Sequence, residues 1–140
     1  MKRSLALTIL ALAALAVLPG SALSQTPAPA QAAKKTDVVG TWRGPALVND
    51  GAVQLEVTVV IGLAELGYTG KISDTNGMVP ETDLRQIAFK DNKLTFEFDF
   101  AQSGSSTLIR MELLLDKGTL KGLWFDPDGN SGTIELTLQK

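Results

Sequence analysis

The sequence predicts an all-β domain: an eight-stranded antiparallel up-and-down meander that closes into a barrel. The clearest observation is a hydrophobic period of two, in which Val53, Leu55 and Val57 alternate with Gln54 and Glu56. This pattern is typical of strands that have one face on a core. Turn sequences that contain Gly, Asn or Asp recur at short intervals along the chain. Loops as short as these join only antiparallel neighbours.

Residues 1–24 have the pattern of a signal peptide. Lys2 and Arg3 precede an apolar stretch, residues 5–18, which is shorter than the about 20 apolar residues of a spanning helix. Small residues up to Ser24 fit cleavage after that residue. We therefore expect a periplasmic or secreted bacterial protein, and an uncleaved membrane anchor is the alternative.

The rest of the chain divides into two parts. Residues 25–37 are rich in Pro and Ala and contain no large apolar side chain, so we expect a disordered linker. Residues 38–140 form the expected β-barrel domain, whose length is common for one domain with one core.

Eight strands follow from the alternation and from the turns between them. The expected strands cover residues 39–47, 53–61, 67–73, 84–89, 94–100, 106–115, 119–125 and 132–139. One short helical turn is expected at residues 63–66. A closed barrel leaves no exposed sheet edge, and a two-sheet sandwich is the alternative. An eight-stranded barrel is either filled by its own side chains or wide enough for one small ligand.

The residue types exclude several kinds of chemistry. The chain has no His and no Cys, which removes the usual catalytic triads and zinc sites. We expect a protein that is not an enzyme and that needs no cofactor or metal. A formal charge of −2 gives no reason to expect a nucleic-acid partner.

The remaining candidate acids have a structural explanation. Glu97, Asp99, Glu112 and Glu135 alternate with core positions, so we expect them on the outer surface of the barrel rather than paired as in a glycosidase. Arg110 is expected to take part in cross-strand charge pairing there.

The sequence Asp126-Pro127-Asp128-Gly129-Asn130 resembles the start of a calcium loop. An EF-hand needs Gly next and Glu at its twelfth position, where this chain has Ser131 and Thr137. We interpret the segment as a hairpin turn, with weak calcium binding as the alternative.

Large amphipathic side chains are the best candidates for binding a ligand. Trp42, Tyr68, Trp124 and Phe125 would suit a barrel mouth, where aromatic rings stack on a small apolar molecule. The competing interpretation is that they fill the core or close the ends of the barrel.

Gly40-Thr41-Trp42 at the start of the first strand resembles the opening motif of the lipocalin and avidin-like barrels, the calycins. That resemblance implies that Trp42 packs across the closed end of the barrel. Residues 38–140 as a whole resemble a small exported bacterial β-module found N-terminal to secreted serine-hydrolase domains. The chain ends just after its last expected strand, so we expect no hydrolase part here. The motifs that carry this likeness are residues 39–44, 70–73, 78–80, 87–89, 94–96, 120–124 and 134–138.

Two functions fit these observations. The first is an exported, non-catalytic binding module for a small apolar or amphipathic ligand. The second is a structural or protein-interaction module of the cell envelope, with a filled barrel and no ligand. It is motivated by residues 108–114, where Leu108 and Leu114 alternate with other apolar residues and leave an apolar patch outside.

Overall fold

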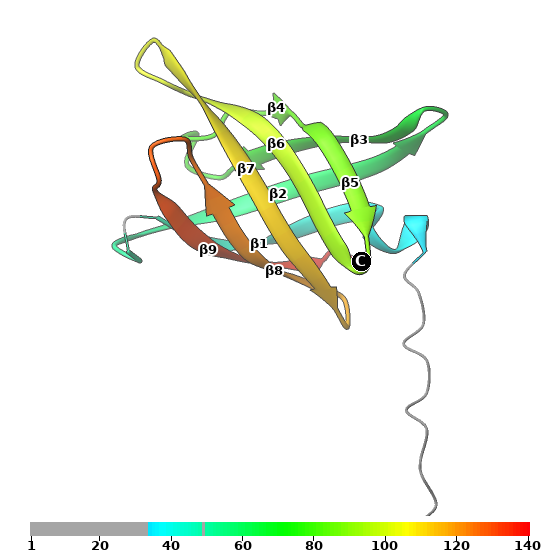
Figure 1. Ribbon diagram of the computed structural model, residues 1–140. Coiled ribbons are helices and arrows are strands. Elements are labelled where there is room, and N and C mark those ends of the chain that lie inside the picture. The colour runs from blue at the N-terminus through cyan, green and yellow to red at the C-terminus, as the bar shows by residue number, and fades with distance from the viewer. Residues whose placement is uncertain (1–33, 49) are drawn as a thin grey trace, which may run out of the picture. The chain divides into compact units, whose positions relative to one another are not determined.

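The computed structural model describes residues 34–48 and 50–140 of the chain, so the expected signal peptide and most of the linker lie outside the described residues. A single antiparallel sheet of nine strands forms a nearly closed up-and-down barrel (Figure 1). A short 3-10 helix, η1 (Lys35–Val38), precedes it. The strands are β1 (Gly40–Val48), β2 (Val53–Ala64), β3 (Gly67–Asp74), β4 (Thr82–Asp83), β5 (Arg85–Lys90), β6 (Lys93–Gln102), β7 (Ser105–Asp116), β8 (Thr119–Phe125) and β9 (Ser131–Leu138).

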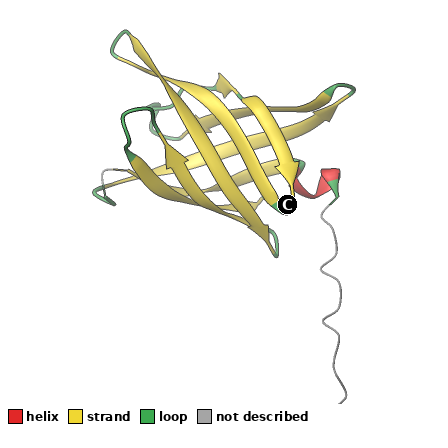
Figure 2. Ribbon diagram, in the orientation of Figure 1, coloured by secondary structure: helices red, strands yellow, loops and turns green. Residues whose placement is uncertain are grey.

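The predicted barrel is confirmed, and the two-sheet sandwich is not what forms. β1 pairs with both β2 and β9, so the first and last strands lie side by side, and the sheet order is β4-β3-β2-β1-β9-β8-β7-β6-β5. Strands and tight turns make up nearly all of the domain in Figure 2. The seam of the barrel therefore lies between β4 and β5, which are consecutive along the chain.

The ninth strand, β4, lies just before the expected fourth strand of residues 84–89, which corresponds to β5. β4 pairs with β3, and the backbone N–H of Leu84 extends this pairing to the carbonyl oxygen of Gly70 at 2.9 Å. From Arg85 onward the chain pairs with β6 instead. A bulge follows at Gln86, whose φ is 53°, and bulges of this kind bend a strand and increase its twist. One segment thus contacts both sides of the seam.

The expected helical turn at residues 63–66 is wrong. β2 continues to Ala64, and Glu65 and Leu66 form a tight hairpin turn into β3. Gly67 after this turn has a φ of 136°, a conformation that glycine adopts without steric cost. The pairing of Leu63 with Tyr68 extends the hairpin past the neighbouring strands (Figure 1).

The two ends of the barrel differ. The mouth end carries the connections 50–52, 75–81, 103–104 and 126–130, whereas the closed end carries η1, the turns 65–66, 91–92 and 117–118, and the C-terminal residues. The backbone N–H of Gln139 donates to the carbonyl oxygen of Thr41 at 2.8 Å, which fixes the C-terminal segment beside β1.

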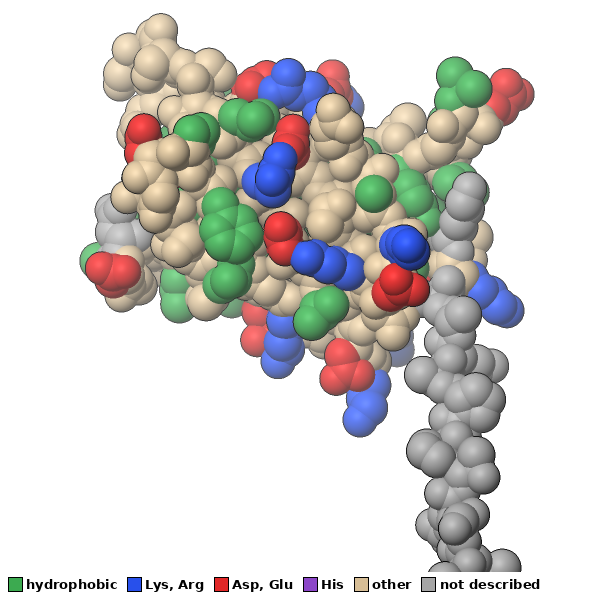
Figure 3. Space-filling model, in the orientation of Figure 1, with side chains coloured by type: hydrophobic (Ala, Val, Ile, Leu, Met, Phe, Trp, Pro, Cys, Tyr) green, Lys and Arg blue, Asp and Glu red, His purple; other side chains and the backbone are tan. Residues whose placement is uncertain are grey.

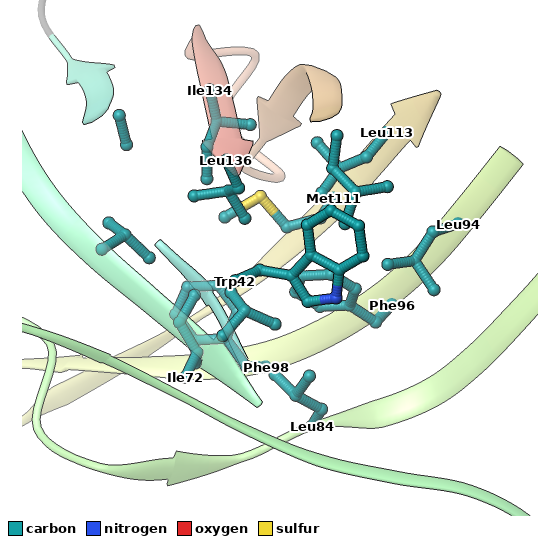
Figure 4. Packing of buried hydrophobic residues seen from close by; sticks show 14 of the residues in the cluster. Trp42, Ile72, Leu84, Leu94, Phe96, Phe98, Met111, Leu113, Ile134 and Leu136 are labelled. Atoms are coloured by element: carbon teal, nitrogen blue, oxygen red, sulfur yellow. The ribbon is translucent and has the colours of Figure 1, made fainter. Parts of the chain in front are cut away.

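The closed half of the barrel is filled by apolar side chains. Trp42 is fully buried there, and its indole Nε1 donates to the carbonyl oxygen of Val38 in η1 at 2.8 Å. Figure 4 shows side chains from several strands converging around this ring. The fully buried aliphatic residues of this half include Val38, Val59, Ile61, Leu94, Leu113, Leu120 and Leu136. Burial on this scale is the main source of stability for a domain without disulfides.

Candidate binding site

A cavity opens at the mouth end of the barrel, with a volume of about 440 Å³. Its walls come from the inward-facing sides of six strands, and they are mostly apolar: Ala46, Val48, Leu55, Val57, Ile72, Phe98, Phe100, Thr107, Ile109, Met111 and Trp124. Met78 and Val79 reach it from the β3–β4 connection, and its polar rim consists of Gln102, Asp126, Asp128 and Asn130. An apolar cavity with a few polar groups at its edge is the usual form of a small-molecule site.

Two neighbouring strands supply a large part of the cavity wall in register. Phe98 pairs with Ile109, and Phe100 pairs with Thr107, on neighbouring strands β6 and β7. One pair deeper, Phe96 opposite Met111 marks the transition to the filled half, because Phe96 is fully buried while Met111 still lines the cavity. The alternation that the sequence predicted thus forms both the core and the cavity wall.

Trp124 is fixed in the wall by its own hydrogen bond. Its indole Nε1 donates to the carbonyl oxygen of Leu47 at 2.9 Å, which joins β8 to β1 across β9. Gly132 lies between them on β9, and a Cβ at this position would lie 2.4 Å from that nitrogen and 2.0 Å from the Leu47 oxygen. The glycine therefore leaves the space that the indole occupies.

The β8–β9 connection forms the acidic part of the rim. The Asp126 carboxylate accepts hydrogen bonds from the backbone N–H groups of Asp128 and Asn130 and from the Asn130 side chain, at 2.7–2.9 Å. These bonds, the Asn130 side chain first, hold the pKa of Asp126 below its usual range. The predicted hairpin turn is confirmed, since Asp126 binds the donors of its own loop.

The β3–β4 connection covers part of the mouth. The Asp74 carboxylate accepts from the backbone N–H of Val79 at 2.7 Å and of Asn76 at 3.1 Å. The backbone N–H of Asp74 donates in turn to the carbonyl oxygen of Val79 at 3.0 Å. This local network places Val79, which is buried, against the cavity.

The structure separates the four predicted site residues, and only Trp124 lines the mouth cavity. Trp42 is buried in the closed half. Tyr68 is the second residue of β3, at the closed end, where burial and then the negative charge of Asp37 raise the pKa of its hydroxyl. Phe125 faces outward beside Arg110. These four side chains therefore do not form one site.

The sequence contained a signal for this separation. Trp124 and Phe125 are neighbours in one strand, so they must point to opposite faces. In a closed eight-strand meander the first and seventh strands run in the same direction. Trp42 near the start of the first and Trp124 near the end of the seventh then lie at opposite ends of the barrel.

The acids expected on the outer surface lie there and are ion-paired. Arg110 donates two hydrogen bonds to Glu97, at 2.7 and 3.0 Å, in the cross-strand pairing that was predicted. Asp99 pairs with Arg85, Glu112 with Lys93 and Glu135 with Lys121. Figure 3 shows charged side chains of both signs interleaved with apolar side chains on one face of the barrel.

An outer groove of about 370 Å³ lies on this charged face. Leu108, Phe125 and Pro127 line it together with Arg110, Glu112 and Asp126. Leu114 and Leu123 on the same strands are 58% and 42% exposed. Leu108 and Leu114, the apolar residues expected outside, are therefore both exposed, and the ion-paired Arg110 and Glu112 lie between them on β7.

Two searches of the described residues gave negative results. Residues 34–48 and 50–140 contain no group of three or more Asp or Glu side chains placed to hold a metal ion. Within the same residues, no helix has the length and hydrophobicity needed to span a membrane.

Comparison with known proteins gave no match to a protein family, to a curated protein or to a solved structure.

Proposed function

We propose that this protein is an exported, non-catalytic binding module that takes a small apolar or amphipathic ligand into the mouth of its barrel. The observation that carries the proposal is the cavity of about 440 Å³ above the filled half, with apolar walls and a polar rim. Ligand sites commonly have volumes of about 300–1,000 Å³ and this distribution of apolar and polar groups. The apolar body of the ligand would lie against Phe98, Ile109 and Trp124.

A non-catalytic role agrees with the chemistry of the rim. The chain has no His or Cys, and His is the commonest general base at neutral pH. The lowered pKa of Asp126 keeps its carboxylate ionised, which does not suit a general acid. The carboxylates of the outer face are ion-paired with Arg or Lys.

The proposed location is the bacterial periplasm or the outside of the cell. It is supported by the sequence of residues 1–24, with Lys2 and Arg3 before an apolar stretch. The calycin resemblance of Gly40-Thr41-Trp42 also stays a prediction. If it holds, the barrel is a member of a large group in which the fold is shared and the ligand is not.

Binding can be tested with a neutral, environment-sensitive naphthylamine dye and its displacement by 1-decanol. We expect dye fluorescence to increase with saturation at one site per chain. Thr107→Trp places a large side chain into the mouth and should abolish this increase. Thr133→Trp places the same side chain on the outer face of β9 and should leave it unchanged. Equal binding by the two variants would contradict the mouth as the site.

The outer groove supports a second candidate function, a protein-interaction module. Exposed Leu114 and Leu123 beside the groove are the observation that favours it, because clustered exposed apolar residues mark interaction surfaces. In that case Leu114→Lys should abolish self-association in sedimentation experiments or reduce capture of an envelope partner, while dye binding at the mouth is retained. The filled barrel that this alternative assumed is present only in the closed half.

A further inference from the structure

Charged side chains are distributed unequally between the two ends of the barrel. The mouth end carries Asp50, Asp74, Asp126 and Asp128, and its four connections contain no Lys or Arg. Glu81 in the β3–β4 connection is neutralised by an ion pair with Lys71. Ligands approaching this end meet a negative potential.

Basic side chains lie elsewhere. Six are ion-paired on the outer face of the barrel: Arg43, Lys71, Arg85, Lys93, Arg110 and Lys121. Of the other lysines in the described residues, Lys34 and Lys35 lie at the start of η1, Lys90 ends β5 at the closed end, Lys117 lies in a turn there and Lys140 is C-terminal. No cation of the described chain is therefore available at the mouth for a carboxylate or phosphate of a ligand.

Asp128 is the acid best placed to meet a bound ligand. It is exposed on the rim of the cavity, and its carboxylate has no hydrogen-bond or ion-pair partner within residues 34–48 and 50–140. Asp126 beside it is occupied by its own loop. A ligand group that donates hydrogen bonds or carries a positive charge would find an unused acceptor here.

The aromatic residues below the rim also favour a positively charged ligand group over a negatively charged one. Phe98, Phe100 and Trp124 all line the cavity, and the faces of such rings attract ammonium groups, most strongly where water is excluded. An anionic group would meet these rings and the aspartates of the mouth, and the described lining of the cavity offers no positive charge to compensate.

We infer that the ligand of the mouth cavity is a cationic amphiphile, with an apolar body inside the barrel and an ammonium-type group against Asp128. This inference rests on the proposed binding function. It adds a selection by charge, in which the mouth attracts cations and rejects fatty-acid-like anions by repulsion.

The test compares three probes of equal chain length: decyltrimethylammonium, 1-decanol and decanoate. Their affinities for the full chain are measured by calorimetry at pH 7 and low ionic strength, below the concentration at which micelles form. The cation should bind about tenfold more tightly than the anion or better, with 1-decanol between them. Added salt should reduce this ratio, because the rim charges are exposed.

Asp128→Asn should reduce the cation-to-anion ratio about threefold or more. Asp116→Asn removes an equal charge at the closed end and should leave the ratio unchanged. The inference is overturned if decanoate binds as well as the cation, or if the Asp128 variant keeps the full ratio. In those cases binding of 1-decanol would still support the proposed function, whereas failure of all three probes to bind would overturn both.

Discussion

The indole N–H of Trp124 donates a hydrogen bond to the carbonyl oxygen of Leu47, and the two residues are 77 positions apart in the sequence. The bond passes over Gly132, on the strand between them. It fixes one wall of the mouth cavity to the opening strand of the barrel, so the shape of the site depends on a residue without a side chain.

Gly132→Ala should destabilise the domain by about 1–3 kcal/mol. The new methyl group would lie 2.0 Å from the Leu47 oxygen, which belongs to the backbone and cannot rotate away. Urea denaturation would measure the loss. Gly62→Ala is the matched control, since its methyl group would lie 2.9 Å from the side-chain hydroxyl of Thr69 and no closer than 3.9 Å to the backbone. A larger loss of stability in Gly62→Ala than in Gly132→Ala would contradict the close approach of Leu47 and Trp124 over Gly132.

The two tryptophans should differ in their contribution to stability. Trp42→Phe removes buried volume and the hydrogen bond to Val38, so it should reduce the free energy of unfolding by about 2–4 kcal/mol. Trp124→Phe should cost about 1–2 kcal/mol, because Trp124 is only partly buried. Acrylamide should quench the remaining fluorescence weakly in Trp124→Phe and more strongly in Trp42→Phe. Similar quenching in both would contradict the assigned positions.

The order of the β8–β9 connection should depend on pH. The folded-state pKa of Asp126 is below its ordinary value of 3.8. The stabilisation is therefore complete above that value and is lost as the pH falls through the folded-state pKa. NMR titration of the Asp126 carboxyl carbon should show a midpoint below 3.8. In Asn130→Ala the midpoint should move upward, because the first cause of the shift is removed; an unchanged midpoint would assign the shift to another group.

Asp74 should control the cover of the mouth. Asp74→Ala removes the acceptor of the Val79 and Asn76 backbone N–H groups and should destabilise the domain by about 1–2 kcal/mol. In this variant, amide hydrogen exchange should accelerate more at Val79 than at the backbone amides of the closed half. Asp74→Asn keeps an acceptor oxygen, so its exchange rate at Val79 should lie between those of Asp74→Ala and the native protein. Unchanged exchange in Asp74→Ala would mean that the connection is held by other contacts.

Local patterns determined much of the fold. Alternation over residues 53–61 and 94–100 identified the strands and their inner faces, because one face of such a strand packs on the core and the other is exposed to water. The turn at residues 126–130 was also predictable from its own residues. The short strand β4 was not predictable, because the chain changes partner between Leu84, which bonds to β3, and Arg85, which pairs with β6, and these two strands are distant in the sequence.

The sequence by itself determined the class of fold, the acids of the outer face and the absence of His and Cys chemistry, because these depend on residue type and on a period of two. Only the tertiary structure decided which aromatic residues share a space. Trp124 lines the cavity while Trp42 is buried below it, and this follows from strand direction around a closed sheet. Likewise, the mouth is acidic because turns that are far apart in the chain meet at one end of the barrel. Their proximity results from the pairing of the strands around the sheet.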